Sequence, residues 1–177
     1  MIQYYWGQWM ISRQFLVILY ALFLLGFSGM LDLLGAEFLH ISLLLNGLVV
    51  FYLSLRLEDF DEIILTLSIL NGVVLDCFWG RPGIGFLLYG TLSAVTIYGL
   101  RGRYDSLLAE LAAGIIAIWL LGGYLLLQFF NNPGGLISGQ WWALLFLAMV
   151  CNVVLILPLV AFLDHITKKL HLLPEKY

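Results

Sequence analysis

Charge is scarce in this chain of 177 residues, because only 11% of them are Asp, Glu, Lys or Arg while 63% are hydrophobic. A soluble domain of this size needs a far more polar surface. The net charge is −3, and the sequence has no basic stripe that could follow phosphates, which argues against nucleic acid as a partner. The mean hydropathy of +1.02 therefore predicts an integral membrane protein.

Cysteines and catalytic motifs are also few. Cys77 and Cys151 lie inside apolar runs without CxxC or Cys/His spacing, which predicts neither a zinc site nor a disulfide framework. The sequence holds no GxSxG, no HExxH and no phosphate-binding loop. One enzymatic alternative is an aspartyl pair of Asp32 and Asp76, as in a lipoprotein signal peptidase, although that family's asparagine–aspartate signatures surround neither residue. We expect no enzyme activity, no cofactor and no metal.

Long apolar blocks predict an all-α fold with about six membrane-spanning helices in one domain over residues 1–177. The expected spans are residues 14–34, 38–55, 63–78, 84–100, 107–130 and 141–166. A break at Gly35–Glu37 should separate the first two spans. The aromatic segment Met1–Arg13 is interpreted as a lead-in lying on the membrane surface. The first run lacks a small-residue cleavage site, which argues against a cleavable signal peptide.

The positions of the basic residues predict the orientation of the chain. Six spans place both termini on one side of the membrane, together with the second and fourth loops. The basic residues on that side are Arg13, Arg56, Arg101, Arg103, Lys168, Lys169 and Lys176. The remaining loops hold only Arg81. By the positive-inside rule both termini are cytoplasmic. Attraction to anionic lipid explains Arg101, Arg103, Lys168 and Lys169, and contact of these residues with a cytoplasmic filament stays open.

The segment Leu67–Arg103 is expected to form a helical hairpin around Asp76. Gly72, Asp76 and Gly80 follow each other at four-residue spacing and so form one stripe on a helix. A carboxylate at the end of a helix is unfavourable by a few tenths to about one kcal/mol, so a nearby group should offset it. Two groups are candidates: Arg81 across the turn, and the free N–H groups of the next helix, where Pro82 is set for the first turn.

The role of Asp76 is left with two interpretations, a structural tie of the hairpin or contact with a partner or ligand. Gly72, Gly83 and Gly85 would let another backbone approach closely, as glycines do between membrane helices. These residues, together with Gly80, Arg81 and Pro82, are therefore predicted to bind a partner or to hold the hairpin.

Asparagines near the middle of three spans, Asn46, Asn71 and Asn152, need hydrogen-bond partners there, and we expect ties between helices more than a substrate pocket. Pro158 cannot donate to Val154, which predicts a kink in the sixth span. Asn152 is placed to cap a carbonyl freed by that kink.

The run GVVLDCFWGRP over residues 72–82 resembles the bacterial rod shape-determining protein MreD family, which shows a comparable G-x-x-x-D-x-x-x-G-x-P run leading into a glycine. At the place of the family's glycine after the proline, this chain has Gly83 and Gly85 on either side of Ile84. A second similarity lies in the last span, where Asn152 is followed by Pro158 and then by basic residues. Length, span number and cytoplasmic termini also agree.

The resemblance implies a non-enzymatic scaffold subunit of the cell-elongation machinery in the bacterial cytoplasmic membrane, which helps to maintain rod shape. Its implied partners are the bitopic scaffold protein MreC, the glycosyltransferase and transpeptidase of peptidoglycan synthesis, the actin-like MreB filament and membrane lipid. The implied fold is similar to the substrate-binding subunits of energy-coupling-factor transporters.

Those transporter subunits give the alternative function, a vitamin-binding subunit. They often carry an A-x-x-x-A groove in the first span, whereas this chain has Ala21, Gly26 and Gly29 there without that spacing.

Overall fold

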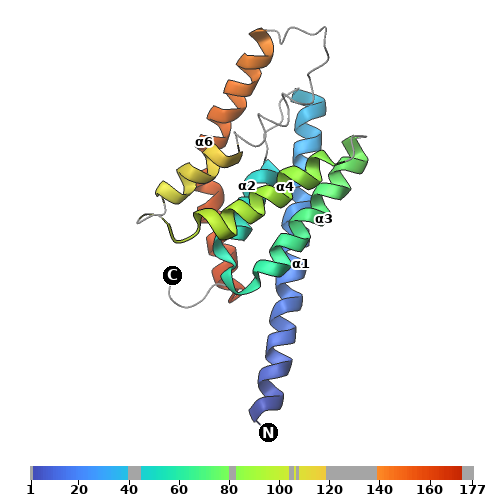
Figure 1. Ribbon diagram of the computed structural model, residues 1–177, viewed down its shortest axis with the longest axis vertical. Coiled ribbons are helices and arrows are strands. Elements are labelled where there is room, and N and C mark those ends of the chain that lie inside the picture. The colour runs from blue at the N-terminus through green and yellow to red at the C-terminus, as the bar shows by residue number, and fades with distance from the viewer. Residues whose placement is uncertain are drawn as a thin grey trace.

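The protein is all-α, as the sequence predicts (Figure 1). The computed structural model describes residues 2–39, 45–79, 83–103, 106, 108–118 and 139–172. In chain order the helices are α1 (Ile2–Leu39), α2 (Leu45–Arg56), the short 3-10 helix η1 (Glu58–Phe60), α3 (Asp61–Trp79), α4 (Ile84–Val95), the π-helical turn η2 (Thr96–Leu100), a helical segment Leu108–Ile118 and α6 (Gly139–Lys169).

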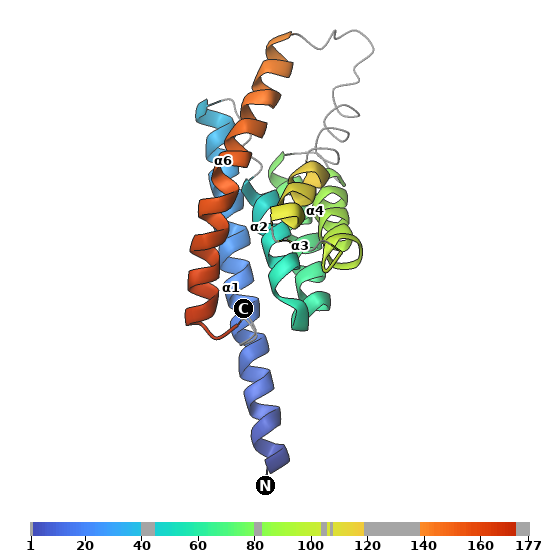
Figure 2. The same cartoon turned by 90° about the vertical axis from the view of Figure 1, so that its left-hand side faces the viewer.

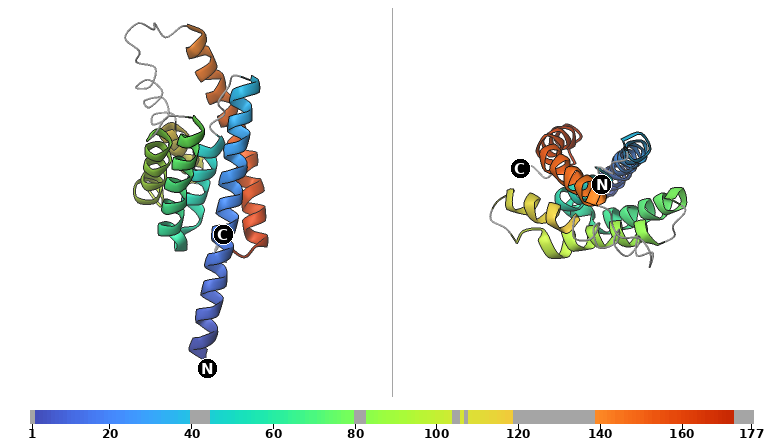
Figure 3. Two further views of the ribbon diagram at one scale, coloured as in Figure 1. Left: turned by 90° about the vertical axis from the view of Figure 1, so that its right-hand side faces the viewer. Right: turned by 90° about the horizontal axis from the view of Figure 1, so that it is seen from above.

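Helix α2 lies at the centre of the bundle, with α1 and α6 on one side and the α3–α4 pair on the other (Figure 3). Every residue of α2 from Asn46 to Leu55 is buried. The segment Leu108–Ile118 packs closely against α2, because a Cβ on Gly114 would collide with the ring of Phe51. The glycine there makes room for a fully buried aromatic side chain.

Helices α3 and α4 run antiparallel and lie side by side over most of their length (Figures 1 and 2). The spans expected at residues 63–78 and 84–100 are confirmed as helices, because α3 covers Asp61–Trp79 and α4 continues through η2 to Leu100. The acidic residues Asp61 and Glu62 occupy the first turn of α3, where the helix dipole favours negative charge.

Two expectations for the N-terminal region are wrong. Helix α1 is continuous from Ile2 to Leu39, so it runs through Gly35–Glu37, where a break was expected. The same continuity places Ile2–Arg13 on one axis with the rest of α1, and this end of α1 projects beyond the bundle (Figure 1). The interpretation of this segment as a lead-in on a membrane surface stays a prediction. A single Gly–Ala pair lowers helix stability too little to end a helix when apolar residues flank the pair on both sides. The second helix starts at Leu45 instead of residue 38.

The last helix, α6, agrees with the expected sixth span and extends to Lys169. Pro158 lies inside it, and the helix continues on both sides of the proline. The expected fifth span is described only at Leu108–Ile118, and its remainder from residue 119 lies outside the described residues.

Large apolar side chains cover much of the outside of the bundle, whereas small polar side chains are buried. Phe23, Phe78 and Phe162 are 68%, 71% and 61% exposed. The buried polar residues are Ser28, Asp32, Asn46, Ser54, Ser68, Asp76, Ser93, Thr96 and Thr167. By length and composition, one helix of the described chain, Arg13–Asp32, is long and apolar enough to cross a membrane, and shorter apolar helices cover Leu45–Arg56, Gly85–Leu100 and Leu108–Ile118.

Candidate partner-binding hairpin

The carboxylate of Asp76, near the end of α3, caps the start of α4. Its Oδ1 accepts a hydrogen bond from the backbone N–H of Gly85 at 2.6 Å, and its Oδ2 accepts from Gly83 at 2.9 Å and from Phe86 at 3.1 Å. The first N–H groups of a helix have no partner within the helix and carry its positive dipole end. Asp76 is only 6% exposed, so these bonds form away from solvent. The prediction that the free N–H groups at the start of the next helix stabilise the Asp76 carboxylate is thus confirmed.

The hairpin closes because glycines occupy the points where the two backbones meet. A Cβ added to Gly72 would collide with the backbone carbonyl of Gly85, and a Cβ on Gly85 would lie 2.6 Å from the carbonyl oxygen of Gly72. Gly83, which precedes α4, has a φ of 99°, in the left-handed region that other residues rarely adopt. The close approach predicted for Gly72 and Gly85 is confirmed, and it brings α4 within reach of Asp76.

Several predicted site residues cannot be placed. Gly80, Arg81 and Pro82 lie outside the described residues, as does the side chain of Asn152. Pro158 lies in α6 and is exposed. Of the predicted set, the structure therefore brings together Gly72, Asp76, Gly83 and Gly85.

Asp32 performs the same task at the neighbouring helix pair, and the sequence analysis missed this role. Its Oδ1 accepts from the N–H of Leu45 at 2.9 Å and its Oδ2 from the N–H of Asn46 at 2.8 Å, so it caps the start of α2. Each of the first two helix pairs is thus closed by an aspartate near the end of its first helix. The signal that could have found it is an acid late in an apolar run that is followed by a second apolar run, a position that Asp76 shares.

Asn46 ties α2 to α1, as expected for an asparagine within a span. Its Oδ1 accepts a hydrogen bond from the hydroxyl of Ser28 at 2.9 Å. Asn46 is fully buried, and its Nδ2 has no hydrogen-bond partner.

The opposite end of the bundle holds a hydrogen-bond network that the sequence analysis also missed. Thr167 of α6 bonds to the hydroxyls of Tyr20 at 3.0 Å and Tyr52 at 2.9 Å. Tyr52 also donates to Asp164 at 2.9 Å, and Asp164 pairs with Arg56 at 2.8 Å. This network, the basal network, joins α1, α2 and α6.

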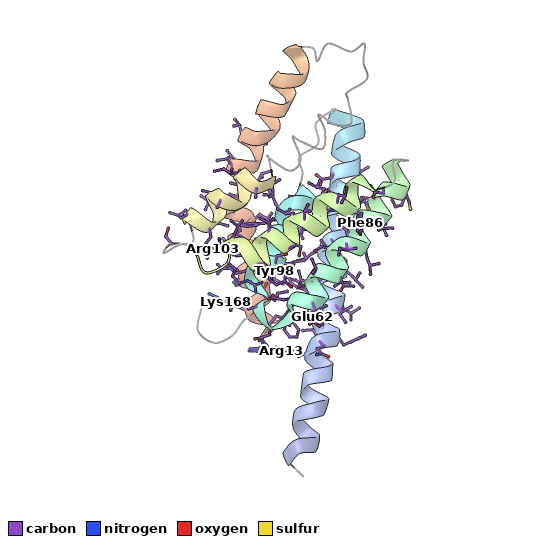
Figure 4. All side chains as sticks on the ribbon, in the orientation of Figure 1. Arg13, Glu62, Phe86, Tyr98, Arg103 and Lys168 are labelled. Atoms are coloured by element: carbon purple, nitrogen blue, oxygen red, sulfur yellow. The ribbon has the colours of Figure 1, made fainter. Side chains whose placement is uncertain are left out.

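Further charge pairs lie toward the same end of the bundle, where Figure 4 labels Arg13, Glu62 and Lys168. Arg101 pairs with Asp61 at 2.7 Å and donates to the carbonyl of Ser54, which holds the end of η2 against α2 and α3. Arg13 pairs with Asp59 at 3.4 Å and lies over the ring of Phe60. Charged and aromatic groups therefore concentrate at the end of the bundle where α1 enters it.

The hydrogen bonds of Asp32 and Asp76 define what these two carboxylates do. Both candidate carboxylates are engaged with backbone donors on each oxygen, which leaves them as helix caps. Within the described residues no group of three or more His, Cys, Asp and Glu could hold a metal ion. Comparison of the chain with protein-family models, with curated proteins and with solved structures finds no match.

Proposed function

We propose that this protein is a polytopic membrane protein of the bacterial cytoplasmic membrane with six spans and both termini in the cytoplasm. The observation that supports it is the distribution of polarity, with large apolar side chains outside and serine, threonine, asparagine and aspartate inside. In lipid, polar groups must pair within the protein, whereas apolar side chains face outward at no cost.

The charge pairs at the end where α1 enters the bundle support the proposed orientation. Arg13, Arg56 and Arg101 all lie there, each paired with an acid. The caps of Asp32 and Asp76 lie at the far end of α1 and α3, which would face outward. Arg13, Arg56 and Arg101 thus lie at one end of the bundle, which is the arrangement that the positive-inside rule would require of a cytoplasmic side.

The function we propose is that of a non-enzymatic scaffold in the cell-elongation machinery, similar to the MreD family. It would bind an MreC-like bitopic protein and connect the MreB-type filament with the glycosyltransferase and transpeptidase that build peptidoglycan. The observation that carries this proposal is the hairpin: the motif of the resemblance, Gly72 to Asp76, builds a close helix contact and a buried cap instead of a reactive group. The anionic lipid of the inner leaflet would contact Lys168 and Lys169, which end α6.

Depletion of the protein in its rod-shaped host tests the proposal. We expect rods to become spheres, and the full-length tagged chain to co-purify from native membranes with the MreC-like partner. A variant with Asp76→Ala should restore shape poorly, whereas Asp59→Ala, which removes an exposed carboxylate, should restore it fully.

Two results would contradict the proposal. Depleted cells that keep their shape and lose uptake of a vitamin would favour the transporter alternative. Retention of a vitamin-sized ligand through purification, detected by mass spectrometry, would do the same.

A further inference from the structure

Helix α6 ends in a Schellman turn, a hydrogen-bonded reversal of the backbone that closes the C-terminus of a helix. The backbone N–H of His171 donates to the carbonyl of Lys168 at 3.0 Å, and the N–H of Leu172 donates to the carbonyl of Thr167 at 3.1 Å. His171 has a φ of 53°. Glycine is the usual residue at this position of the turn, because a residue with a side chain costs free energy in the left-handed region. The end of α6 is therefore closed by a strained turn.

The side chain of Leu172 fixes this turn to the bundle. It is only 1% exposed and belongs to the hydrophobic core, whereas the four residues before it, from Lys168 to His171, are exposed. A left-handed residue other than glycine persists only where surrounding contacts hold it in place. Burial of the Leu172 side chain is such a contact, so the strain at His171 and the burial of Leu172 oppose each other.

Arg13 of α1 is the second contact that holds the turn. Its Nη2 donates to the backbone carbonyl of Leu172 at 3.1 Å and lies 3.4 Å from Oδ2 of Asp59. Its guanidinium also lies over the ring of Phe60. Figure 4 labels Arg13 and Lys168 at this end of the bundle. One arginine thus joins α1, η1 and the end of α6.

We propose that residues 168–172, which we call the C-terminal latch, form a conformational device that opens while the rest of the bundle stays folded. Opening leaves no charge unpaired, because Arg13 keeps its ion pair with Asp59. It also leaves the basal network in place, because Thr167 binds Tyr20 and Tyr52 through its side chain and not through the turn. The strain at His171 is released when the latch opens. The inference goes beyond the proposed function and requires none of its partners.

Limited digestion of the full-length protein with trypsin in mild detergent tests the latch, because a protease cleaves a folded segment only when it opens. Cleavage after Lys169, detected by mass spectrometry, measures opening of the latch. Cleavage after Arg103, which is exposed, is the reference for protease activity. Cleavage after Arg56, which pairs with Asp164 in the basal network, reports unfolding of the bundle. In the wild type we expect cleavage after Arg103 first, then after Lys169, and last after Arg56.

Three variants should move the opening of the latch in opposite directions. Leu172→Ala and Arg13→Gln each remove one closing contact, so cleavage after Lys169 should become roughly tenfold faster. His171→Gly removes the strain of the turn, so the same cleavage should become roughly threefold to tenfold slower. Asp59→Ala is the matched control for Arg13→Gln, because it removes the ion pair of Arg13 and keeps the bond to Leu172; it should not accelerate the cleavage.

Three results would overturn the inference. Unchanged cleavage after Lys169 in both Leu172→Ala and Arg13→Gln would show that these contacts do not close the turn. Cleavage in His171→Gly that is as fast as in the wild type, or faster, would show that the turn stores no strain. If cleavage after Arg56 rose in step with cleavage after Lys169, the turn would open only with the whole bundle. None of these results bears on the proposed function, which depletion in the host tests separately.

Discussion

Replacing Asp76 by alanine removes the acceptor for all three N–H groups at the start of α4. The loss of a helix cap alone costs about 0.5–2 kcal/mol. Each further donor left unpaired in a buried site costs about 1–3 kcal/mol. Because the three bonds share one carboxylate, their costs do not add fully, and we expect Asp76→Ala to lower the free energy of unfolding by about 3–5 kcal/mol.

Asp76→Asn separates the geometry of the cap from its charge. The amide keeps the shape of the carboxylate but offers one acceptor oxygen, whereas both oxygens of Asp76 accept bonds. We expect a loss of about half that of the alanine variant. Asp59→Ala is the matched control, because that carboxylate is exposed and its pairing with Arg13 is worth at most about 1 kcal/mol.

The measurement is unfolding of the purified full-length protein in mild detergent, titrated with sodium dodecyl sulfate and followed by far-UV circular dichroism. The expected order of stability is wild type and Asp59→Ala together, then Asp76→Asn, then Asp76→Ala. If Asp76→Ala unfolded at the same detergent composition as Asp59→Ala, the capping argument would be refuted.

The same titration checks three more changes. Gly72→Ala should lower the free energy of unfolding by about 2–3 kcal/mol, because the added Cβ collides with the carbonyl of Gly85. Gly26→Ala, whose Cβ meets nothing within 4 Å, should be neutral or stabilise the protein by up to about 1 kcal/mol. Equal stability of the two variants would contradict the close helix contact. Gly83→Ala should cost about 1–2 kcal/mol because its φ is 99°, and an unchanged stability would show that the turn relaxes freely. Tyr52→Phe should lower the free energy of unfolding by about 1–3 kcal/mol, because the lost hydroxyl bonds to both Asp164 and Thr167. The control Tyr98→Phe, at an exposed position, should change it little. A neutral Tyr52→Phe would mean that the basal network does not hold α6.

The sequence predicted best what depends on neighbours along the chain. The bounds of α3 and of α4 with η2 follow closely from the lengths of the two apolar runs at residues 63–78 and 84–100. The capping by Asp76 was one of two anticipated offsets, because a carboxylate at a helix end needs a donor close in sequence.

What the sequence did not predict depends on distance in space or on small energy differences. In the basal network, Thr167 bonds to Tyr20 and Tyr52, and each of these tyrosines is more than a hundred residues away from it along the chain. No local pattern marks such a meeting. The continuity of α1 through Gly35–Glu37 was missed because a weak helix former does not end a helix that apolar residues sustain on either side.

The two aspartate caps have a consequence for how the chain is made. Asp32 and Asp76 each join helices that are neighbours along the chain, α1 to α2 and α3 to α4. Each pair can therefore form the hydrogen bonds at the start of its second helix as soon as that helix leaves the ribosome. These bonds do not require α6 to be present. The protein can therefore assemble as a succession of helical pairs, so that the residues of the basal network, contributed by α1, α2 and α6, come together last.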